Sequence, residues 1–302
     1  QLTAQAQTAW HDRIIRKPTA SMKALLAPML EQYKLSATHL NNFIDISHGG
    51  PQGFLMNNLL RFPQAKSAGA SFGTAIHAAL QRAHTHLSAT GERRPAEDVI
   101  GDFVRELHDQ RLNIDEFNHY AKRGTDALSK FLHTEYDSFT PAQKAELNFA
   151  SRGVTLGDAR LTGSLDLVDI NDNHIFVTDY KTGKPSTSWT GRGDYEKIKL
   201  HKYRQQLMFY QLLCQHSRDY ASYEFDGAIL QFVEPDSHGN IHSLDQTFSA
   251  EELAQFTILI AAVWRCITTL ELPDASAYSA DYKGMLQFEK DLIAGNEVGA
   301  QN

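Results

Sequence analysis

The segment 163–181 constrains the fold more than any other part of the chain, because two strand-like runs flank a short polar turn. The residues at 172–173 suit a two-residue hairpin loop. In that register Asp166 lies opposite Asp179, and directly opposed residues of an antiparallel pair share one face of the sheet. Lys181 follows Asp179 by two residues and points to the same face. The sequence therefore predicts a β-hairpin that brings two carboxylates and a lysine together.

Two apposed carboxylates on apolar strands repel each other, and burial disfavours their charged forms. A divalent metal ion with oxygen ligands would relieve this repulsion, with Lys181 beside it. The prediction depends on register, because a loop one residue longer or shorter would put the aspartates on opposite faces. In the alternative interpretation both aspartates are exposed positions of a half-solvated hairpin.

The composition is typical of a globular protein and excludes several other classes. The 302 residues are 42% hydrophobic and 22% charged, enough for one large domain or two small ones with ample core. The longest apolar stretch, near 256–264, is too short to span a bilayer, and the first residues lack a signal-peptide pattern. Cys214 and Cys266 are the only cysteines, which argues against a disulfide scaffold or a four-cysteine metal site. We expect a cytoplasmic protein without membrane attachment, and the missing initiator Met suggests a fragment of a longer polypeptide.

Basic residues gather in one segment of an otherwise acidic chain. The formal net charge is −7, yet residues 181–206 contain seven basic and two acidic side chains and so carry +5. A cationic segment beside a metal site suits a substrate with a phosphate backbone. A solvated loop that leads into a helix is the alternative. The residues predicted to contact DNA phosphates are Lys184, Arg192, Lys197, Lys199, Lys202 and Arg204.

The periodicity of the sequence predicts helices first and a sheet afterwards. Helices are predicted over 22–33, from a Ser36 cap to Gly49–Pro51, from Ser71 onward, over 96–140, over about 200–216 and beyond 250. Strands are predicted near 145–150, in the hairpin, near 223–233 and near 241–248, with a flexible loop over 183–193. This order is typical of an α/β core with a helical annex.

Four short motifs occur in an order that resembles the RecB-type nucleases of the PD-(D/E)XK superfamily. They are Gly73-Thr-Ala-Ile-His77, Gly163-Ser-Leu-Asp166, Asp179-Tyr-Lys-Thr-Gly183 and Gln206-Leu-Met-Phe-Tyr210. The resemblance covers roughly residues 35–210 and implies a restriction-endonuclease-like core, with a mixed central sheet flanked by helices. Gly50-Pro51 stands where the family often has Cys-Pro. The chain also lacks the four cysteines of the iron–sulfur branch.

The resemblance implies a role for each matching residue. His77, Asp166 and Asp179 would bind Mg²⁺ or Mn²⁺, and the backbone carbonyl of Tyr180 would add a further ligand. Lys181 would position or help deprotonate the attacking water and stabilise the charged transition state. The role of Glu146 stays open, because it matches a family acid whose direct function is the least certain. The roles of Gln206 and Tyr210 also stay open. These two residues lie at i and i+4 on one helix face, so they would point at the site or the DNA, or else pack on the sheet.

The resemblance implies a metal-dependent DNA nuclease, and we expect an exonuclease of DNA repair and recombination that acts on single strands or duplex ends. The sequences of residues 35–43 and 203–210 are most similar to those of nuclease domains fused to the C-terminus of UvrD/Rep-type helicases. Residues 1–34 would then be a helical linker from the helicase, and 35–302 the nuclease domain. The chain has no phosphate-binding Gly-Lys-Ser/Thr loop, so it is not itself an ATP motor. The alternatives are a non-catalytic DNA-binding or docking domain that keeps the fold, and a hydrolase of small phosphoesters, which the basic segment disfavours.

Overall fold

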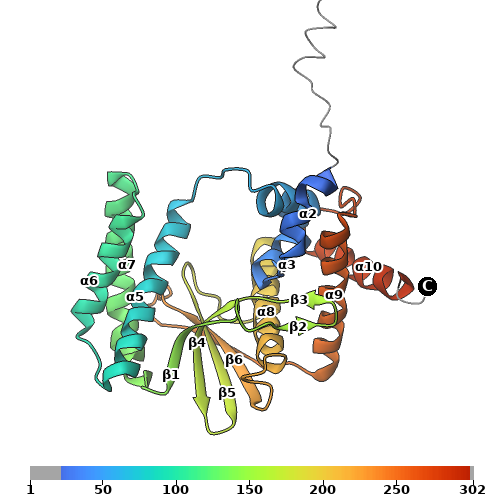
Figure 1. The fold of residues 1–302 in the computed structure, drawn as a ribbon. Helices are drawn as coiled ribbons and strands as arrows, with labels where there is room; N and C mark the ends of the chain where they lie inside the picture. The colour runs from blue at the N-terminus through green and yellow to red at the C-terminus, as the bar shows by residue number, and fades with distance from the viewer. Residues whose placement is uncertain (1–21, 300–302) are drawn as a thin grey trace, which may run out of the picture.

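The computed structural model describes residues 22–299, with side chains up to residue 295. Figure 1 shows a central sheet with helices on either side of it. The helices are α2 (Met22–Glu31), α3 (Ala37–Ile44), α4 (Gly50–Phe54), α5 (Ala68–Thr90), α6 (Ala96–Asp109), α7 (Ile114–Glu135), α8 (Asp194–Gln215), α9 (Ala250–Thr269) and α10 (Tyr282–Gly299), with 3-10 turns η1 (Ile46–His48) and η3 (Tyr136–Ser138) and a π-helical turn η2 (Leu55–Leu59). The strands are β1 (Gln143–Asn148), β2 (Thr155–Leu156), β3 (Ala159–Arg160), β4 (Ser164–Asn171), β5 (His174–Lys181), β6 (Glu224–Phe232) and β7 (Ser243–Gln246).

The main sheet has five strands in the order β1-β4-β5-β6-β7. β5 and β6 are parallel, and the other neighbouring strands are antiparallel. Helix α8 lies between the two parallel strands in the chain, because such a pair needs a long crossover connection. The predicted α/β fold, with a mixed sheet flanked by helices, is therefore confirmed. The separate β2–β3 ribbon was not predicted, since two-residue strands are too short for an alternating pattern.

The two faces of the sheet bury different hydrophobic cores. Leu167 and Tyr180 belong to the core formed with α5, α6 and α7. Val168 and Val177 point to the opposite face and pack with α3, α8 and α9. Burial on both faces explains why the central strands are so apolar. None of the described helices is long and apolar enough to cross a membrane.

The hairpin of β4 and β5 has the predicted register. Asn171 pairs with His174, Val168 with Val177 and Leu167 with Thr178. Asp172 in the loop adopts a positive φ of 49°, which aspartate tolerates better than most residues. Continued by one residue, this register sets Asp166 opposite Asp179.

Three helix boundaries differ from the prediction. Helix α8 begins at Asp194 rather than near 200. The earlier start was missed because the first turn is polar and lacks apolar periodicity, but its acidic residues favour a helix N-terminus there. Helix α3, capped by Ser36 as predicted, ends at Ile44, and Gly49–Pro51 begins α4, with Pro51 in its first turn. Helix α5 begins at Ala68 behind a Ser67 cap, so His77 lies inside the helix. The predicted helical linker is described only from Met22, where α2 begins; its residues 1–21 lie outside the described part of the chain.

Candidate active site

Asp166 on β4 is held between helix α5 and strand β5. His77 Nδ1 lies 3.2 Å from Asp166 Oδ2, and the backbone N–H of Tyr180 donates to the same oxygen at 2.9 Å. Burial disfavours the charged form of both side chains, yet their mutual hydrogen bond raises the pKa of His77 and lowers that of Asp166. Gly73 allows this approach of α5, because a Cβ there would lie only 3.3 Å from Thr182 Oγ1.

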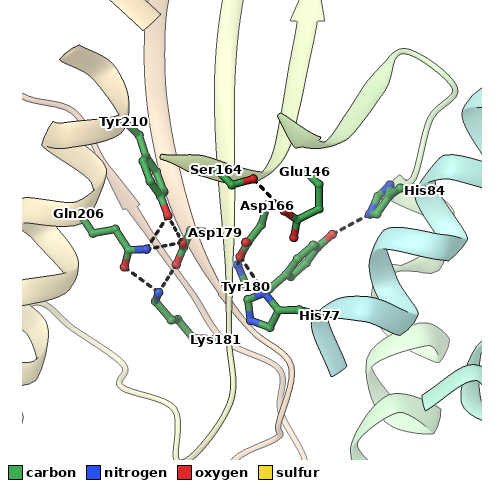
Figure 2. Close-up of polar contacts among 10 residues, drawn as sticks. All are labelled: His77, His84, Glu146, Ser164, Asp166, Asp179, Tyr180, Lys181, Gln206 and Tyr210. Atoms are coloured by element: carbon green, nitrogen blue, oxygen red, sulfur yellow. Dashed lines mark hydrogen bonds and ion pairs between the residues drawn. The ribbon is translucent and has the colours of Figure 1, made fainter. Parts of the chain in front are cut away.

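Asp179 on β5 is almost completely enclosed, with 1% of its surface exposed. Its Oδ1 accepts hydrogen bonds from Gln206 Nε2 and Tyr210 Oη, each at 3.1 Å. Its Oδ2 lies 2.5 Å from Lys181 Nζ but accepts no hydrogen bond of acceptable angle. Burial raises the pKa of Asp179 more than the lysine lowers it. Figure 2 shows these partners converging on Asp179 from α8 and from the end of β5.

Lys181 is enclosed by the same group of side chains. Its ammonium group donates to Gln206 Oε1 at 2.8 Å and lies 4.6 Å from the centre of the Tyr203 ring. Burial alone would lower the pKa of Lys181, but Asp179, Tyr203 and Asp166 together outweigh burial and raise this pKa. The contact fixes a cation at the end of β5.

Gln206 and Tyr210 point into the site rather than to an open surface. Gln206 Nε2 lies 2.5 Å from Tyr210 Oη, and both groups donate to Asp179. The Tyr210 side chain is buried. Because one helix face carries both residues, α8 orients the carboxylate and the lysine together. Their predicted contact with DNA stays a prediction.

Glu146 on β1 lies beside Asp166 through an unusual backbone conformation. Ala145 pairs with Leu167 and Leu147 with Leu165, which leaves Glu146 level with Asp166. The φ angle of Glu146 is +52°, a left-handed value that costs a non-glycine residue about 1–3 kcal/mol. Its Oε2 accepts a hydrogen bond from Ser164 Oγ at 2.8 Å (Figure 2). This strain places a third carboxylate at the candidate centre.

The carboxylates do not converge as the sequence predicted. Among the described residues, no group of three or more His, Cys, Asp or Glu side chains is arranged to hold a metal ion. The reason is visible in Figure 2: Asp166 turns to His77 on one side, and Asp179 turns to the partners from α8 on the other. The donor set nevertheless fits a hard divalent cation, because it consists of carboxylate oxygens and an imidazole and includes the buried Asp179 Oδ2 without a hydrogen bond.

The predicted basic segment is divided by helix α8. Lys202 forms an ion pair with the buried Asp45 at 2.6 Å, and Arg204 forms one with Glu252. Both are therefore engaged by acids rather than free to bind phosphate. The side chains without an ion pair among the described residues are Lys184, Arg192, Lys197 and Lys199. Of these, Lys184 and Arg192 are exposed, and Lys197 and Lys199 are half-buried.

Two positioning contacts were missed by sequence reasoning. Glu234, just after β6, accepts two hydrogen bonds from Arg123 of α7, at 2.6 and 2.9 Å, and one from the backbone N–H of Gly183. Gly183 has a φ of +95°, which favours glycine, and this bond fixes the turn that follows Lys181. No local pattern pairs residues 111 positions apart.

The second contact lies behind β5, where His84 Nε2 meets Tyr180 Oη at 2.8 Å. The His84 ring stacks on Phe139, and burial lowers its pKa to about 4, so the ring is neutral. A signal did exist: His77 and His84 are seven residues apart, on one face of α5.

Comparisons with known proteins agree with this architecture. A model of the PD-(D/E)XK nuclease superfamily matches residues 34–280. A crystal structure from Eubacterium rectale, described as a "putative exonuclease", has a TM-score of 0.53 and 12% sequence identity, over 84% of this chain and 88% of that one. At that identity the likeness shows the fold alone. No protein of curated function matches the sequence. The match over most of the chain, on a mixed sheet that carries an aspartate and a lysine at the end of β5, shows that this protein belongs to the PD-(D/E)XK nuclease superfamily.

Proposed function

We propose that this protein is a metal-dependent deoxyribonuclease that hydrolyses phosphodiester bonds from DNA ends. The observation that carries the proposal is the enclosed contact of Lys181 with Asp179, beside Asp166 in the register of the hairpin. Burying a carboxylate and an ammonium group is less favourable for folding than burying apolar side chains of similar size. Such a buried pair therefore indicates a chemical role. Members of this superfamily typically use divalent metals.

The ligands in the proposal are His77, Asp166 and Asp179, with the backbone carbonyl of Tyr180, and the ion is Mg²⁺ or Mn²⁺. When bound, such an ion polarises the scissile phosphate and lowers the pKa of water at the site. Release of Asp179 Oδ2 from Lys181 by a small side-chain rotation would supply a free carboxylate oxygen. Glu146, held by Ser164 beside Asp166, is the further acid that this centre would use.

Lys181 acts as a cation in this proposal. Its ammonium group orients the attacking water and stabilises the negative charge that develops on the phosphate. Gln206 holds Lys181 with its carbonyl oxygen and Asp179 with its amide nitrogen, so one side chain sets the distance between them. Tyr210 fixes the other side of Asp179. Lys184, Arg192, Lys197 and Lys199 would bind the DNA backbone near this centre.

The proposal is tested with end-labelled single-stranded and double-stranded DNA, in Mg²⁺, in Mn²⁺ and in EDTA. We expect cleavage that requires the divalent ion and is lost in Asp166→Asn and Asp179→Asn. Asp169→Asn is the matched control on the same strand as Asp166: among the described residues the Asp169 carboxylate accepts one hydrogen bond, from Gln143 at 3.5 Å, and its replacement should leave cleavage unchanged. Cleavage in EDTA, or active Asp166 and Asp179 variants, would refute the proposed centre.

A non-catalytic DNA-binding domain is the second candidate. It is favoured by the internal pairing of Asp166 and Asp179, each of which already has protein partners. In that case the wild-type protein binds DNA equally well with and without a divalent ion and cleaves none of these substrates.

The proposal includes a covalently linked helicase of UvrD/Rep type and a role in DNA repair and recombination. Its support is the similarity of 35–43 and 203–210 to helicase-fused nuclease domains. The test is co-purification of a helicase region with this chain from its natural source as one polypeptide. Isolation of the domain alone, with full activity, would contradict it.

A further inference from the structure

A polar pocket, which we call the carboxamide pocket, lies one helical turn from the candidate active site. It has a volume of about 560 Å³, within the range of about 300–1,000 Å³ that small-molecule sites occupy. Its walls come from α3, the α4–η2 segment, the irregular segment 60–67 and α8, and include Asn42, Phe54, Asn57, Asn58, Gln64 and Lys202. In Figure 1 the segment 60–67 passes from the α3–α4 region to α5, above the sheet.

Four carboxamides in this pocket are joined in two pairs. Asn42 Nδ2 donates to Asn58 Oδ1 at 3.4 Å, and Gln64 Nε2 donates to Asn57 Oδ1 at 2.5 Å. Each pair uses one donor and one acceptor and leaves one of each without a partner in the described part of the chain. This holds even if both amides of a pair are turned over, since the pair then exchanges its roles. The pocket therefore offers two amide donors and two amide acceptors to a ligand.

The charges of the pocket cancel. Asp45, the buried acid in its wall, is paired with Lys202 at 2.6 Å and also contacts His48 at 3.1 Å. An anion such as a free phosphate finds no unpaired cation here, and a metal ion finds no free carboxylate. An uncharged ligand with donors and acceptors side by side fits best, and nucleobase edges have this character. Phe54 adds an aromatic contact to the wall.

The backbone around the pocket is also unusual. Asn57 and Asn58 lie in the π-helical turn η2 (Leu55–Leu59). Such turns are rare, less favourable than the α-helix, and frequent at functional sites. Here the turn points both asparagines of a consecutive pair into the pocket.

The pocket is joined to the active site by α8. Lys202 and Gln206 are four residues apart on one helix face, so the pocket wall and the Asp179–Lys181 contact are about 6 Å apart along the helix axis. We infer that this pocket receives one unstacked base of a single-stranded DNA substrate and contacts its edge through the four carboxamides. The inference rests on the proposed nuclease function and specifies its substrate as a strand with unpaired bases near the scissile phosphate.

The test uses single-stranded oligonucleotides in which one abasic residue is moved along the sequence. Binding is measured in EDTA by fluorescence anisotropy, and cleavage of the same set in Mn²⁺. We expect one position at which the abasic residue weakens wild-type binding by roughly tenfold, the effect of a well-made base contact. Asn57→Ala/Asn58→Ala should bind the intact strand about tenfold more weakly and show no such position.

Asn118→Ala is the matched control, because Asn118 is exposed on α7 and does not line the pocket that holds Asn57 and Asn58. It should keep the wild-type profile. A flat abasic profile of the wild-type protein, or a wild-type profile in the double variant, would overturn the inference. Position-dependent binding without any cleavage would instead refute the nuclease function and leave the base pocket standing, because the binding arm needs no catalysis.

Discussion

At the scale of single residues, Asp179 is a carboxylate enclosed in the protein interior. Both its oxygens are buried, and its three partners are the amide of Gln206, the hydroxyl of Tyr210 and the ammonium group of Lys181. Removing any one partner leaves a buried polar atom unsatisfied, at a cost of about 1–3 kcal/mol. The same contacts that stabilise the carboxylate therefore also position it for chemistry.

We expect Lys181→Ala to lower turnover about 10²–10³-fold with little effect on divalent-metal affinity, because the lysine contacts water and the transition state rather than the ion. Turnover in Mn²⁺ and metal affinity by calorimetry are the measurements. Lys144→Ala is the control, since Lys144 is an exposed lysine on strand β1. Parallel losses of affinity and turnover would show that Lys181 is only the counterion of Asp179.

Asp179→Asn should abolish cleavage and also lower the free energy of unfolding. The substitution leaves the Lys181 ammonium, 14% exposed, without its counterion, and breaking a buried pair costs about 3–5 kcal/mol. Asp179→Asn/Lys181→Met removes both charges and should regain much of that loss, which urea unfolding measures. Additive losses in the double variant would mean that the two charges do not interact.

The same scale shows what a single sequence cannot reveal. The sequence was sufficient to predict that Asp166, Asp179 and Lys181 share one face of the sheet, because the register of a single hairpin relates them. The left-handed backbone of Glu146 has no sequence signature, since glutamate is not one of the residues that favour a positive φ. The turn of Asp179 toward α8 depends on contacts across more than 25 residues, which no periodicity records.

At the scale of elements, helix α8 presents different side chains on its two faces, although its basic residues lie in one segment of the sequence. Its basic residues form one cluster in the sequence, but each residue is rotated by about 100° from the one before it around the helix. Lys197 and Arg204 therefore lie on one face of α8, and Lys199, Lys202 and Gln206 lie on the opposite face. Lys197 and Arg204 line a small pocket with Tyr282, whereas Lys202 lines the carboxamide pocket. The predicted basic strip counted charge along the chain, whereas the structure distributes these residues around the helix, and their contact with DNA stays a prediction.

Lys202→Ala should therefore lower the stability of the fold. Its partner Asp45 is 3% exposed. Burial raises the pKa of Asp45, but the hydrogen bonds from Lys202 and Ser47, with the charges of Lys202 and His48, together outweigh burial and lower it. A lowered pKa means that the pair stabilises the fold above the ordinary carboxyl pKa, and that this contribution is lost as the pH falls through the lower folded value. We expect a loss of about 1–3 kcal/mol at neutral pH, shrinking in acid.

Urea unfolding at several pH values measures this loss, with Lys199→Ala as the control from the same helix. An equal loss of stability in both variants, or a loss for Lys202→Ala that persists in strong acid, would contradict the structural role of the pair.

The turn after β5 gives a second prediction at this scale. Glu234→Gln keeps the shape but weakens the hydrogen bonds to Arg123 and to the N–H of Gly183. We expect turnover to fall about tenfold, the equivalent of about 1.4 kcal/mol, with unchanged metal affinity, because Lys181 is held less firmly. Asp126→Asn, in the same pocket as Glu234, is the control. A change in metal affinity alone would show that Glu234 acts by another route.

At the scale of the whole molecule, the order of elements was sufficient to predict an α/β core, and the family resemblance added the mixed central sheet. Helices, a hairpin and then a strand–helix–strand unit leave few topologies, because a parallel pair needs a crossover. What the order could not provide was the carboxamide pocket. Asn42, Asn57, Asn58 and Gln64 are ordinary surface residues in the sequence, and only the packing of the 42–64 region against α8 brings them beside Lys202.

The charge distribution of the whole molecule predicts how it binds DNA. Against a net charge of −7, Arg192 and Lys199 carry positive charges without acidic ion-pair partners among the described residues, in the segment that leads from β5 into α8. Arg192→Glu/Lys199→Glu should weaken binding to every sequence alike and flatten the dependence of log affinity on log salt by about one unit per lost phosphate contact. Arg204→Glu is the contrasting variant: because Arg204 is already paired with Glu252, its reversal should lower stability and leave that slope unchanged. If all three reversals shifted the slope equally, DNA would run along both faces of α8, and the strand would have to pass over the Glu252 side of the helix as well.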